Sequence, residues 1–166
     1  MVHGILIPAS DSRPLALQPF DRLEDYQLAV NGWIEAVDIP DIVATLYVNE
    51  EGLLRQLPYN RRATFLWWFH APAARGHTRL VGDAVLVGLP DSDGASTNIP
   101  TGIARRLLER TPFTVSIREP SDARWHPSPV DHEDYLEAII WATLLMEHAP
   151  GLQVRVDGTP TGEASE

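Results

Sequence analysis

The stretch from Ile42 to Leu89 constrains the fold of this chain more than any other. Two apolar runs, at 42–48 and 80–89, enclose a polar turn at 49–52 and a segment punctuated by Pro58 and Asn60. β-Branched and aromatic residues favour strands, whereas Asn, Gly and Pro between apolar runs favour turns. The stretch therefore predicts buried strands connected by turns, with a helix beginning after Asn60.

The remaining segments follow the same alternation of apolar runs and breakers. We expect further strands at 4–8, 33–39, 53–57, 113–117 and 152–156, and helices at 21–30, 61–70, 103–110 and 131–146. The proline-containing segments 9–19 and 121–129 are expected to be loops. Strands mixed with about three to four helices predict an α+β fold, in which helices pack on a mixed or antiparallel sheet.

Three local predictions concern turns and caps. Asp21 with Glu24 predicts a capping box on the first helix, and Asn60 predicts an N-cap on the second. Residues 49–52 predict a hairpin connection to a returning strand at 53–57, with Gly52 in the left-handed conformation.

The chain has 166 residues, which suits one domain. A domain of this size buries about 70% of the surface that its unfolded chain exposes, so it folds without disulfides or metals. We expect a single domain over 1–156, composed of a part at 5–88 and a helix and strand extension at 100–156. The polar segment 157–166 is expected to be a disordered tail.

Cysteine is absent, which excludes disulfides, thiolate catalysis and cysteine-ligated metal sites. The N-terminus lacks a basic region and a signal core, and no stretch approaches the roughly 18 apolar residues of a membrane span. We therefore expect a cytoplasmic protein with no membrane partner.

The net charge of −10 is unevenly distributed, and all 13 basic residues are arginine. Residues 1–60 carry nine acids and three arginines, residues 61–124 carry six and nine, and residues 125–166 carry eight and one. Because non-specific nucleic-acid binding depends on cationic contacts to phosphate, the acidic balance argues against a nucleic-acid partner.

Several short motifs together resemble a known family. They are Val48-Asn49-Glu50-Glu51-Gly52, Leu57-Pro58-Tyr59-Asn60 with Ala63, Val81-Gly82-Asp83-Ala84, Ile7-Pro8-Ala9, and Val30-Asn31-Gly32-Trp33. Over roughly Ile5 to Gly88 the chain is similar to an uncharacterised domain family of actinobacterial, plasmid and phage proteins. That family has no established activity, so the resemblance implies a phage or mobile-element setting and no mechanism.

The motif residues are those that turns and strands require. Asn60 can cap a helix, Gly82 allows two backbone segments to approach closely, and Asp83 can accept a hydrogen bond from a turn amide. We interpret the set as a scaffold: Asn49, Glu50, Glu51, Gly52, Asn60, Gly82 and Asp83.

The sequence predicts no catalytic residue, metal or cofactor. The six histidines form no pair at helical ligand spacing, and no serine lies in a Gly-x-Ser-x-Gly context. Asp91 to Gly94 begins like a calcium loop but lacks its later ligands.

The leading hypothesis is a non-enzymatic accessory or regulatory protein of a phage, prophage or plasmid that binds a host protein. Successive helical residues point about 100° apart, so Trp67 and Trp68 are not both expected in the core. The resulting interaction patch, rich in the residue types of binding hot spots, comprises Arg61, Arg62, Trp68 and Phe69.

Two further hypotheses, and the oligomeric state, stay open. One is a small hydrolase-type enzyme whose cleft combines Glu50, Glu51, Asp83 and His70. The other is an acidic nucleic-acid mimic that occupies a DNA-binding protein, suggested by the acidic ends. A homodimer is compatible with the sequence, and two tryptophans on opposite sides of a buried helix would remove the interaction patch.

Overall fold

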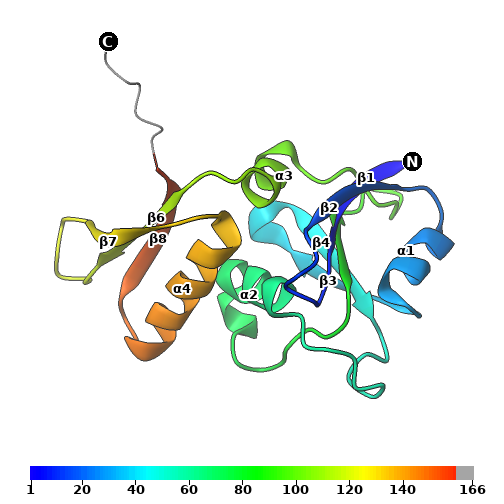
Figure 1. The fold of residues 1–166 in the computed structure, drawn as a ribbon, viewed down its shortest axis with the longest axis horizontal. Helices are drawn as coiled ribbons and strands as arrows, with labels where there is room; N and C mark the ends of the chain where they lie inside the picture. The colour runs from blue at the N-terminus through cyan, green and yellow to red at the C-terminus, as the bar shows by residue number, and fades with distance from the viewer. Residues whose placement is uncertain (160–166) are drawn as a thin grey trace, which may run out of the picture. The chain divides into compact units, whose positions relative to one another are not determined.

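The computed structural model describes residues 1–159 and confirms an α+β fold with four α-helices and two antiparallel sheets (Figure 1). The chain divides into two compact units, Met1–Leu108 and Glu109–Glu166. The sequence did not indicate that the strands would form two separate sheets, because strand patterns do not specify which strands pair.

The first unit contains a five-stranded antiparallel sheet in the order β2-β1-β5-β4-β3. Its strands are β1 (Val2–Ile7), β2 (Ala16–Phe20), β3 (Ile34–Ile39), β4 (Ala44–Asn49) and β5 (Ala84–Gly88). Its helices are α1 (Leu23–Val30), α2 (Arg61–His70) and α3 (Thr101–Leu108), with short 3-10 turns at Pro40–Ile42 and Pro72–Ala74.

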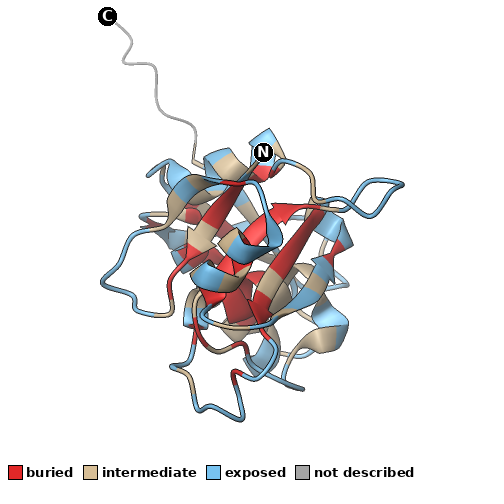
Figure 2. Ribbon diagram, turned by 90° about the vertical axis from the view of Figure 1, so that its right-hand side faces the viewer, coloured by how far each residue is buried: buried red, intermediate tan, exposed pale blue. Residues whose placement is uncertain are grey.

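Both faces of this sheet are covered, because α1 and α2 lie on opposite sides of it (Figure 1). Val85 and Val87 of β5 pack with α1 in a cluster that also contains Phe20, Tyr26 and Val30. Leu86 lies on the other face beside its strand partners Ile5 and Leu46, and all three are fully buried. The buried residues thus concentrate in the middle strands (Figure 2), as the apolar run at 80–89 predicted.

The predicted hairpin after β4 is wrong. The strand neighbours of β4 are β3 and β5, and residues 50–56 form consecutive turns instead of a returning strand. The amide of Arg55 donates to the Glu51 carbonyl, and the amide of Leu57 donates to the Gly52 carbonyl. The turn is anchored to the end of α1 by side-chain hydrogen bonds, which local turn propensity cannot reveal.

The predicted N-terminal loop and first helix cap also need correction. Residues 16–20 form the edge strand β2, which tolerates Pro19 because an edge strand leaves one side of its backbone unpaired. The capping box of α1 uses Asp25, whose carboxylate accepts from the amides of Arg22 and Asp21, and these bonds lower the pKa of Asp25. Neither Asp21 nor Glu24 has the predicted role in that box. By contrast, the predicted Asn60 cap of α2 is confirmed.

The second unit has a three-stranded antiparallel sheet in the order β7-β6-β8, with α4 (Tyr135–His148) packed against it. The strands are β6 (Phe113–Arg118), β7 (His126–His132) and β8 (Gln153–Gly158). The rings of Phe113 and Tyr135 join sheet and helix with centroids 5.3 Å apart. The guanidinium groups of Arg118 and Arg155 each lie 4.6 Å from the Trp125 ring.

Three predictions in this unit differ from the structure. The edge strand β7 occupies part of the predicted loop at 121–129, and again contains prolines. Helix α4 begins later than predicted, because Asp134 accepts the Glu137 amide and serves as its N-cap. The predicted tail begins inside β8 at Asp157 and Gly158, and its residues 160–166 lie outside the described part of the chain.

Val43 has a backbone conformation that β-branched residues disfavour, with φ 53° and ψ 45°. Its side chain is exposed, so packing does not compensate for the strain. Asn tolerates the left-handed region, in which other L-residues lose about 1–2 kcal/mol. We expect Val43→Asn to raise the free energy of unfolding by about 1 kcal/mol in urea denaturation.

Val130→Asn is the matched control, because Val130 is similarly exposed and lies in β7 without a positive φ. We expect no gain in stability from that variant. Equal effects of the two substitutions would contradict the assignment of strain to Val43.

Candidate functional site

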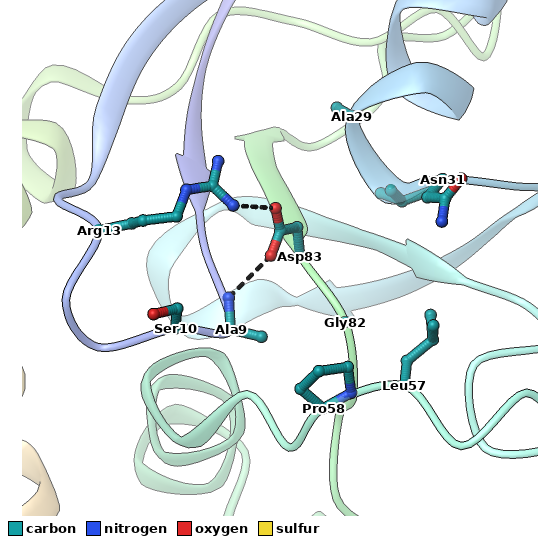
Figure 3. A pocket seen from close by; sticks show the side chains of 10 residues that line it. Ala9, Ser10, Arg13, Ala29, Asn31, Leu57, Pro58, Gly82 and Asp83 are labelled. Atoms are coloured by element: carbon teal, nitrogen blue, oxygen red, sulfur yellow. Dashed lines mark hydrogen bonds and ion pairs between the residues drawn. The ribbon is translucent and has the colours of Figure 1, made fainter.

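A pocket of about 320 Å³ lies on the first unit, where the 9–13 loop, the end of α1, the turn at 57–58 and the residues before β5 meet (Figure 3). Its volume is at the lower end of the range of small-ligand pockets. The lining residues are Ala9, Ser10, Arg13, Ala29, Val30, Asn31, Leu57, Pro58, Gly82 and Asp83. Four of the sequence motifs that resemble a known family contribute to this wall.

Asp83 is the acidic side chain of the pocket. Its Oδ1 accepts the Ala9 amide at 2.9 Å, and its Oδ2 accepts Nη1 of Arg13 at 2.8 Å (Figure 3). The first of these is the predicted hydrogen bond to a turn amide. The Asp83 side chain is 26% exposed, so the carboxylate is held in place and still reaches solvent.

Asn60 connects two of the segments that line the pocket. It is fully buried, and its Nδ2 donates to the carbonyls of Ile7 at 2.8 Å and Gly82 at 2.9 Å. Its Oδ1 accepts the Ala63 amide at 3.0 Å and so caps α2. One side chain therefore fixes the end of β1, the start of α2 and the residue before Asp83.

Asn49 makes an equivalent connection on the other side of the pocket. Its Nδ2 donates to the carbonyls of Val30 at 3.0 Å and Asn31 at 2.9 Å, and its Oδ1 accepts the Glu51 amide at 2.9 Å. The side chain is almost completely buried. Asn49 thus binds the end of α1 to the 49–57 turn, which explains why the turn does not form a hairpin.

Two of the motif glycines, Gly52 and Gly82, allow close approach between segments. A Cβ on Gly82 would lie 2.9 Å from Cδ1 of Leu57, and its φ of 75° is unfavourable for other residues. A Cβ on Gly52 would lie 2.8 Å from Cγ2 of Val81. The φ of Gly52 is not positive, so the predicted left-handed conformation is wrong and proximity to Val81 accounts for the glycine.

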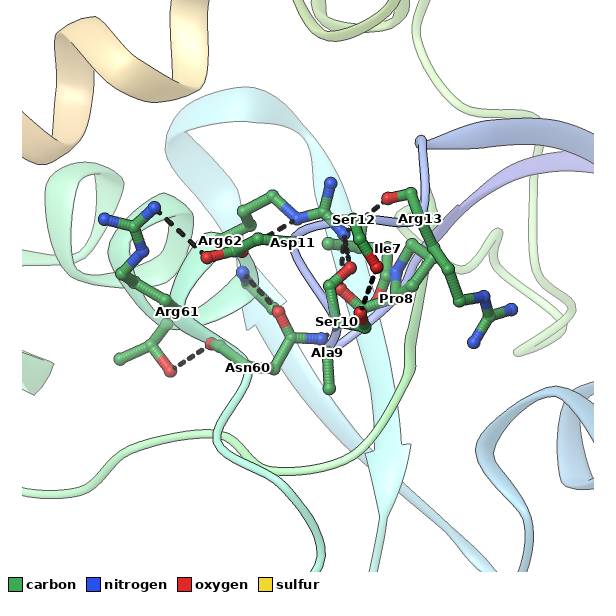
Figure 4. Close-up of polar contacts among 12 residues, drawn as sticks. Ile7, Pro8, Ala9, Ser10, Asp11, Ser12, Arg13, Asn60, Arg61 and Arg62 are labelled. Atoms are coloured by element: carbon green, nitrogen blue, oxygen red, sulfur yellow. Dashed lines mark hydrogen bonds and ion pairs between the residues drawn. The ribbon is translucent and has the colours of Figure 1, made fainter.

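Arg62, which the sequence placed in the interaction patch, holds the 8–13 loop (Figure 4). Its Nη2 donates to the carbonyls of Pro8 at 2.6 Å, Ser10 at 2.8 Å and Arg13 at 2.9 Å. Only 12% of the side chain is exposed. The guanidinium therefore stabilises the loop beside the pocket and offers little surface to a partner.

The other three residues of that patch also contact their own chain. Arg61 is exposed and pairs with Asp11 at 3.2 Å. The half-buried indole of Trp68 donates to the Thr78 carbonyl at 3.0 Å, and the half-buried ring of Phe69 packs edge-on to His70. Exposed area on this part of α2 is therefore concentrated at Arg61.

The four side chains of the proposed enzyme cleft have separate surroundings. Asp83 pairs with Arg13, whereas His70 pairs with Asp41 through Nδ1 at 2.5 Å. Burial lowers the pKa of His70, and Asp41 opposes that shift. Glu50 and Glu51 lie exposed on the turn after β4. These contacts do not assemble the predicted cleft.

Four exposed apolar side chains belong to the two segments that Asn49 joins. Trp33 is 65% exposed, and Leu28, Leu53 and Leu54 are 80%, 61% and 82% exposed. The Glu50 amide donates to the Trp33 carbonyl at 2.8 Å, which places the turn against Trp33. We call these four residues, with Glu50 and Glu51, the Trp33 surface.

The sequence did not reveal this surface. The pattern at 33–39 predicts a strand that includes Trp33, and residues 53–57 predict a returning strand that includes both leucines. Either strand would bury apolar side chains. The available signal was the position of Trp33 directly after the helix stop at Asn31 and Gly32, where no strand ladder protects it.

Within residues 1–159, no group of three or more histidine or acidic side chains is placed to hold a metal ion. In the same described part of the chain, no helix combines the length and apolar character required to cross a bilayer.

Fold and site together define a small α+β domain with a carboxylate-containing pocket beside an exposed apolar surface. The chain belongs to the family described as domain of unknown function DUF3846, whose model matches residues 3–111. The match extends the resemblance beyond Gly88, through α3 and the end of the first unit at Leu108, to residue 111. No curated protein and no solved structure matches the chain.

Proposed function

We propose that this protein is a non-enzymatic accessory protein of a phage, prophage or plasmid, which binds a basic host protein through the Trp33 surface. The exposure of Trp33, and of three leucines on the two segments that Asn49 joins, carries the proposal. The setting rests on the resemblance to phage and plasmid proteins noted from the sequence motifs.

The composition of the Trp33 surface is typical of a binding hot spot. Tryptophan is enriched among residues whose truncation weakens binding most, because its large ring buries much area with few rotatable bonds. Leu28, Leu53 and Leu54 supply apolar area around it, and Glu50 and Glu51 supply charge. This arrangement fits an apolar centre with a charged rim.

The backbone of the Trp33 surface is held by hydrogen bonds from both sides. Asn49 joins the carbonyls of Val30 and Asn31 to the turn, and Nη1 of Arg55 also donates to the Asn31 carbonyl. A surface fixed in advance loses less conformational freedom on binding. The motif residues therefore support binding by shaping this surface.

The charge of residues 21–54, which include the Trp33 surface, indicates the kind of partner. Residues 21–54 contain eight acidic residues and one arginine. Such a segment attracts cationic surfaces and repels phosphate. A basic protein is therefore favoured over nucleic acid, and proteins that themselves bind nucleic acids carry such basic surfaces.

The patch at Arg61, Arg62, Trp68 and Phe69 is less suited to a partner than the Trp33 surface. Arg62 and Trp68 donate hydrogen bonds to carbonyls of their own chain. A partner would have to compete with those bonds, whereas Trp33 and Leu54 are free of that cost.

The test compares the wild-type protein with the double variant Trp33→Ala, Leu54→Ala. Each is used to capture proteins from host lysate, and the captured protein is identified, purified and titrated by calorimetry. Loss of a hot-spot tryptophan typically weakens binding by 2 kcal/mol or more, so we expect at least about 30-fold weaker affinity. The affinity should also fall as salt rises.

Trp141→Ala is the matched control, because Trp141 is an exposed tryptophan on α4 of the second unit. Arg61→Ala tests the patch on α2. Unchanged affinity of the Trp33 and Leu54 variant, or an equal loss with either control, would contradict the proposal. A concentration-dependent dimer in sedimentation, lost on the same double substitution, would assign the surface to a second copy of the chain.

A further inference from the structure

We propose that the pocket at Asp83 receives the side chain of an arginine or lysine from the basic partner. The inference rests on the proposed function and names how the partner is recognised. Three observations support it: Asp83 can accept further hydrogen bonds, the guanidinium of Arg13 already binds Asp83, and the rest of the pocket wall is largely apolar.

Asp83 has unused capacity to accept hydrogen bonds. A carboxylate offers about four lone-pair positions, and each oxygen of Asp83 accepts one described bond, from Ala9 or from Arg13. The Ala9 amide fixes the orientation of the carboxylate. An incoming guanidinium or ammonium can therefore bind a carboxylate that is already in position.

Arg13 shows that a guanidinium fits against Asp83. Its Nη1 lies 2.8 Å from Oδ2, and its side chain is largely exposed. Exposed ion pairs contribute little to stability, so exchanging Arg13 for a partner's cation is easy. The guanidinium of Arg13 thus occupies the position that we assign to the cationic group of the partner.

The rest of the pocket suits the aliphatic stem of such a side chain. Ala29, Val30, Leu57 and Pro58 contribute apolar atoms to the wall. Lysine and arginine bury their methylene groups against apolar surface while the charged end remains with a polar partner. Asn31 also lines the pocket and lies across the space from Asp83 (Figure 3).

The pocket is continuous in sequence with the Trp33 surface. Ala29 to Asn31 lie between Leu28 and Trp33, and Leu57 ends the turn that carries Leu53 and Leu54. A basic segment that covers Trp33 can therefore place one cationic side chain in the pocket.

The first measurement titrates the whole protein with Nα-acetyl-arginine amide, followed by the amide NMR signals of Asn31 and Asp83. We expect saturable shifts with a millimolar dissociation constant. Nα-Acetyl-norleucine amide, which has the stem without the charge, and Nα-acetyl-glutamate amide should produce no saturable shifts at these residues.

Two variants test whether the pocket prefers a cationic side chain. Asp83→Asn keeps an oxygen that can accept the Ala9 amide but removes the charge, and we expect at least tenfold weaker binding of the arginine probe. Arg13→Gln removes the competing guanidinium, and we expect binding at least threefold tighter. Asp93→Asn, which removes an exposed acid in the 91–94 turn, is the control and should bind as the wild type does.

Three outcomes would overturn the inference: no saturable shift with the arginine probe, weaker binding after Arg13→Gln, or binding of the glutamate probe. The last of these would assign the pocket to carboxylates. If the probe fails while the Trp33 and Leu54 variant still loses its partner, only this inference is wrong. If the probe binds as expected while that variant keeps its partner, the proposed function is wrong and the cation pocket stands.

Discussion

Asn60→Asp is expected to destabilise the protein by about 5 kcal/mol, although Asp is as good a helix cap as Asn. The introduced carboxylate can still accept the Ala63 amide, but it cannot donate to the carbonyls of Ile7 and Gly82. Each buried acceptor left without a donor costs about 1–3 kcal/mol, and burying the charge adds to this. Urea denaturation of the two proteins measures the difference.

The pH dependence of the stability of Asn60→Asp tests whether burial of the introduced carboxylate causes the destabilisation. Burial beside two carbonyls raises the folded-state pKa of the introduced carboxyl above its unfolded value of about 3.9. The protonated form, which can donate one hydrogen bond, is then favoured in the folded state. Stability relative to the wild type is therefore highest below that unfolded pKa and decreases as pH rises toward the folded pKa.

Asp134→Asn is the matched control at the N-cap of α4. Asp134 is partly exposed and accepts the Glu137 amide, a role that an Asn oxygen can also fill. We expect a change of less than about 1 kcal/mol. A similarly small effect of Asn60→Asp would show that Asn60 acts only as a cap and does not hold the pocket.

The cap made by Asn60 was predictable from sequence because it is local. The residue lies three positions before the amide that it accepts, at the start of an apolar helix. Its bonds to Ile7 and Gly82 span 53 and 22 residues. Sequence order alone does not reveal such contacts, so the cap was found and the connection across the pocket was missed.

The turn after β4 shows how tertiary contacts override local preference. Asn49 to Gly52 has suitable residues for a hairpin, and the apolar pair that follows resembles a strand. In the structure the Asn49 side chain binds carbonyls at the end of α1, which directs the chain away from β4. The same bonds leave Leu53 and Leu54 exposed, so one error concealed both the turn and the surface.

The edge strands were missed for a different reason. Strands β2 and β7 contain prolines, which usually indicate loops. Each pairs with a single described neighbour, so a missing amide on the outer side has no effect on the ladder. The central strands β4 and β5 were predicted because burial on both faces gives a continuous apolar run.

The chemical role of the motif residues follows from their positions around one pocket. Asn60 and Asn49 hold opposite walls, Gly82 permits close contact with Leu57, and Asp83 points into the space between them. The sequence supported the interpretation of these residues as a scaffold. Only the structure shows that this scaffold surrounds a pocket and fixes an exposed surface.

Asn49→Ala is expected to reduce both stability and binding. The substitution leaves the Val30 carbonyl and the Glu51 amide without their side-chain partner, while Arg55 still donates to the Asn31 carbonyl. Loss of two nearly buried partners and a small cavity predict destabilisation of about 3 kcal/mol in urea denaturation. The remaining folded protein should show faster amide exchange at Glu51, because the turn is no longer fixed to α1.

The affinity of Asn49→Ala for the partner should fall by more than the unfolded fraction of the variant explains. The Trp33 surface keeps every contact residue in this variant, so a loss of affinity measures the ordering that Asn49 provides, and we expect about tenfold. Arg55→Gln is the comparison variant: it removes only the exposed Arg55 bond to the Asn31 carbonyl and leaves Asn49 in place, so we expect a smaller loss of affinity than with Asn49→Ala. Equal affinity of wild type and Asn49→Ala, measured where both are folded, would show that the partner does not need the turn held against α1.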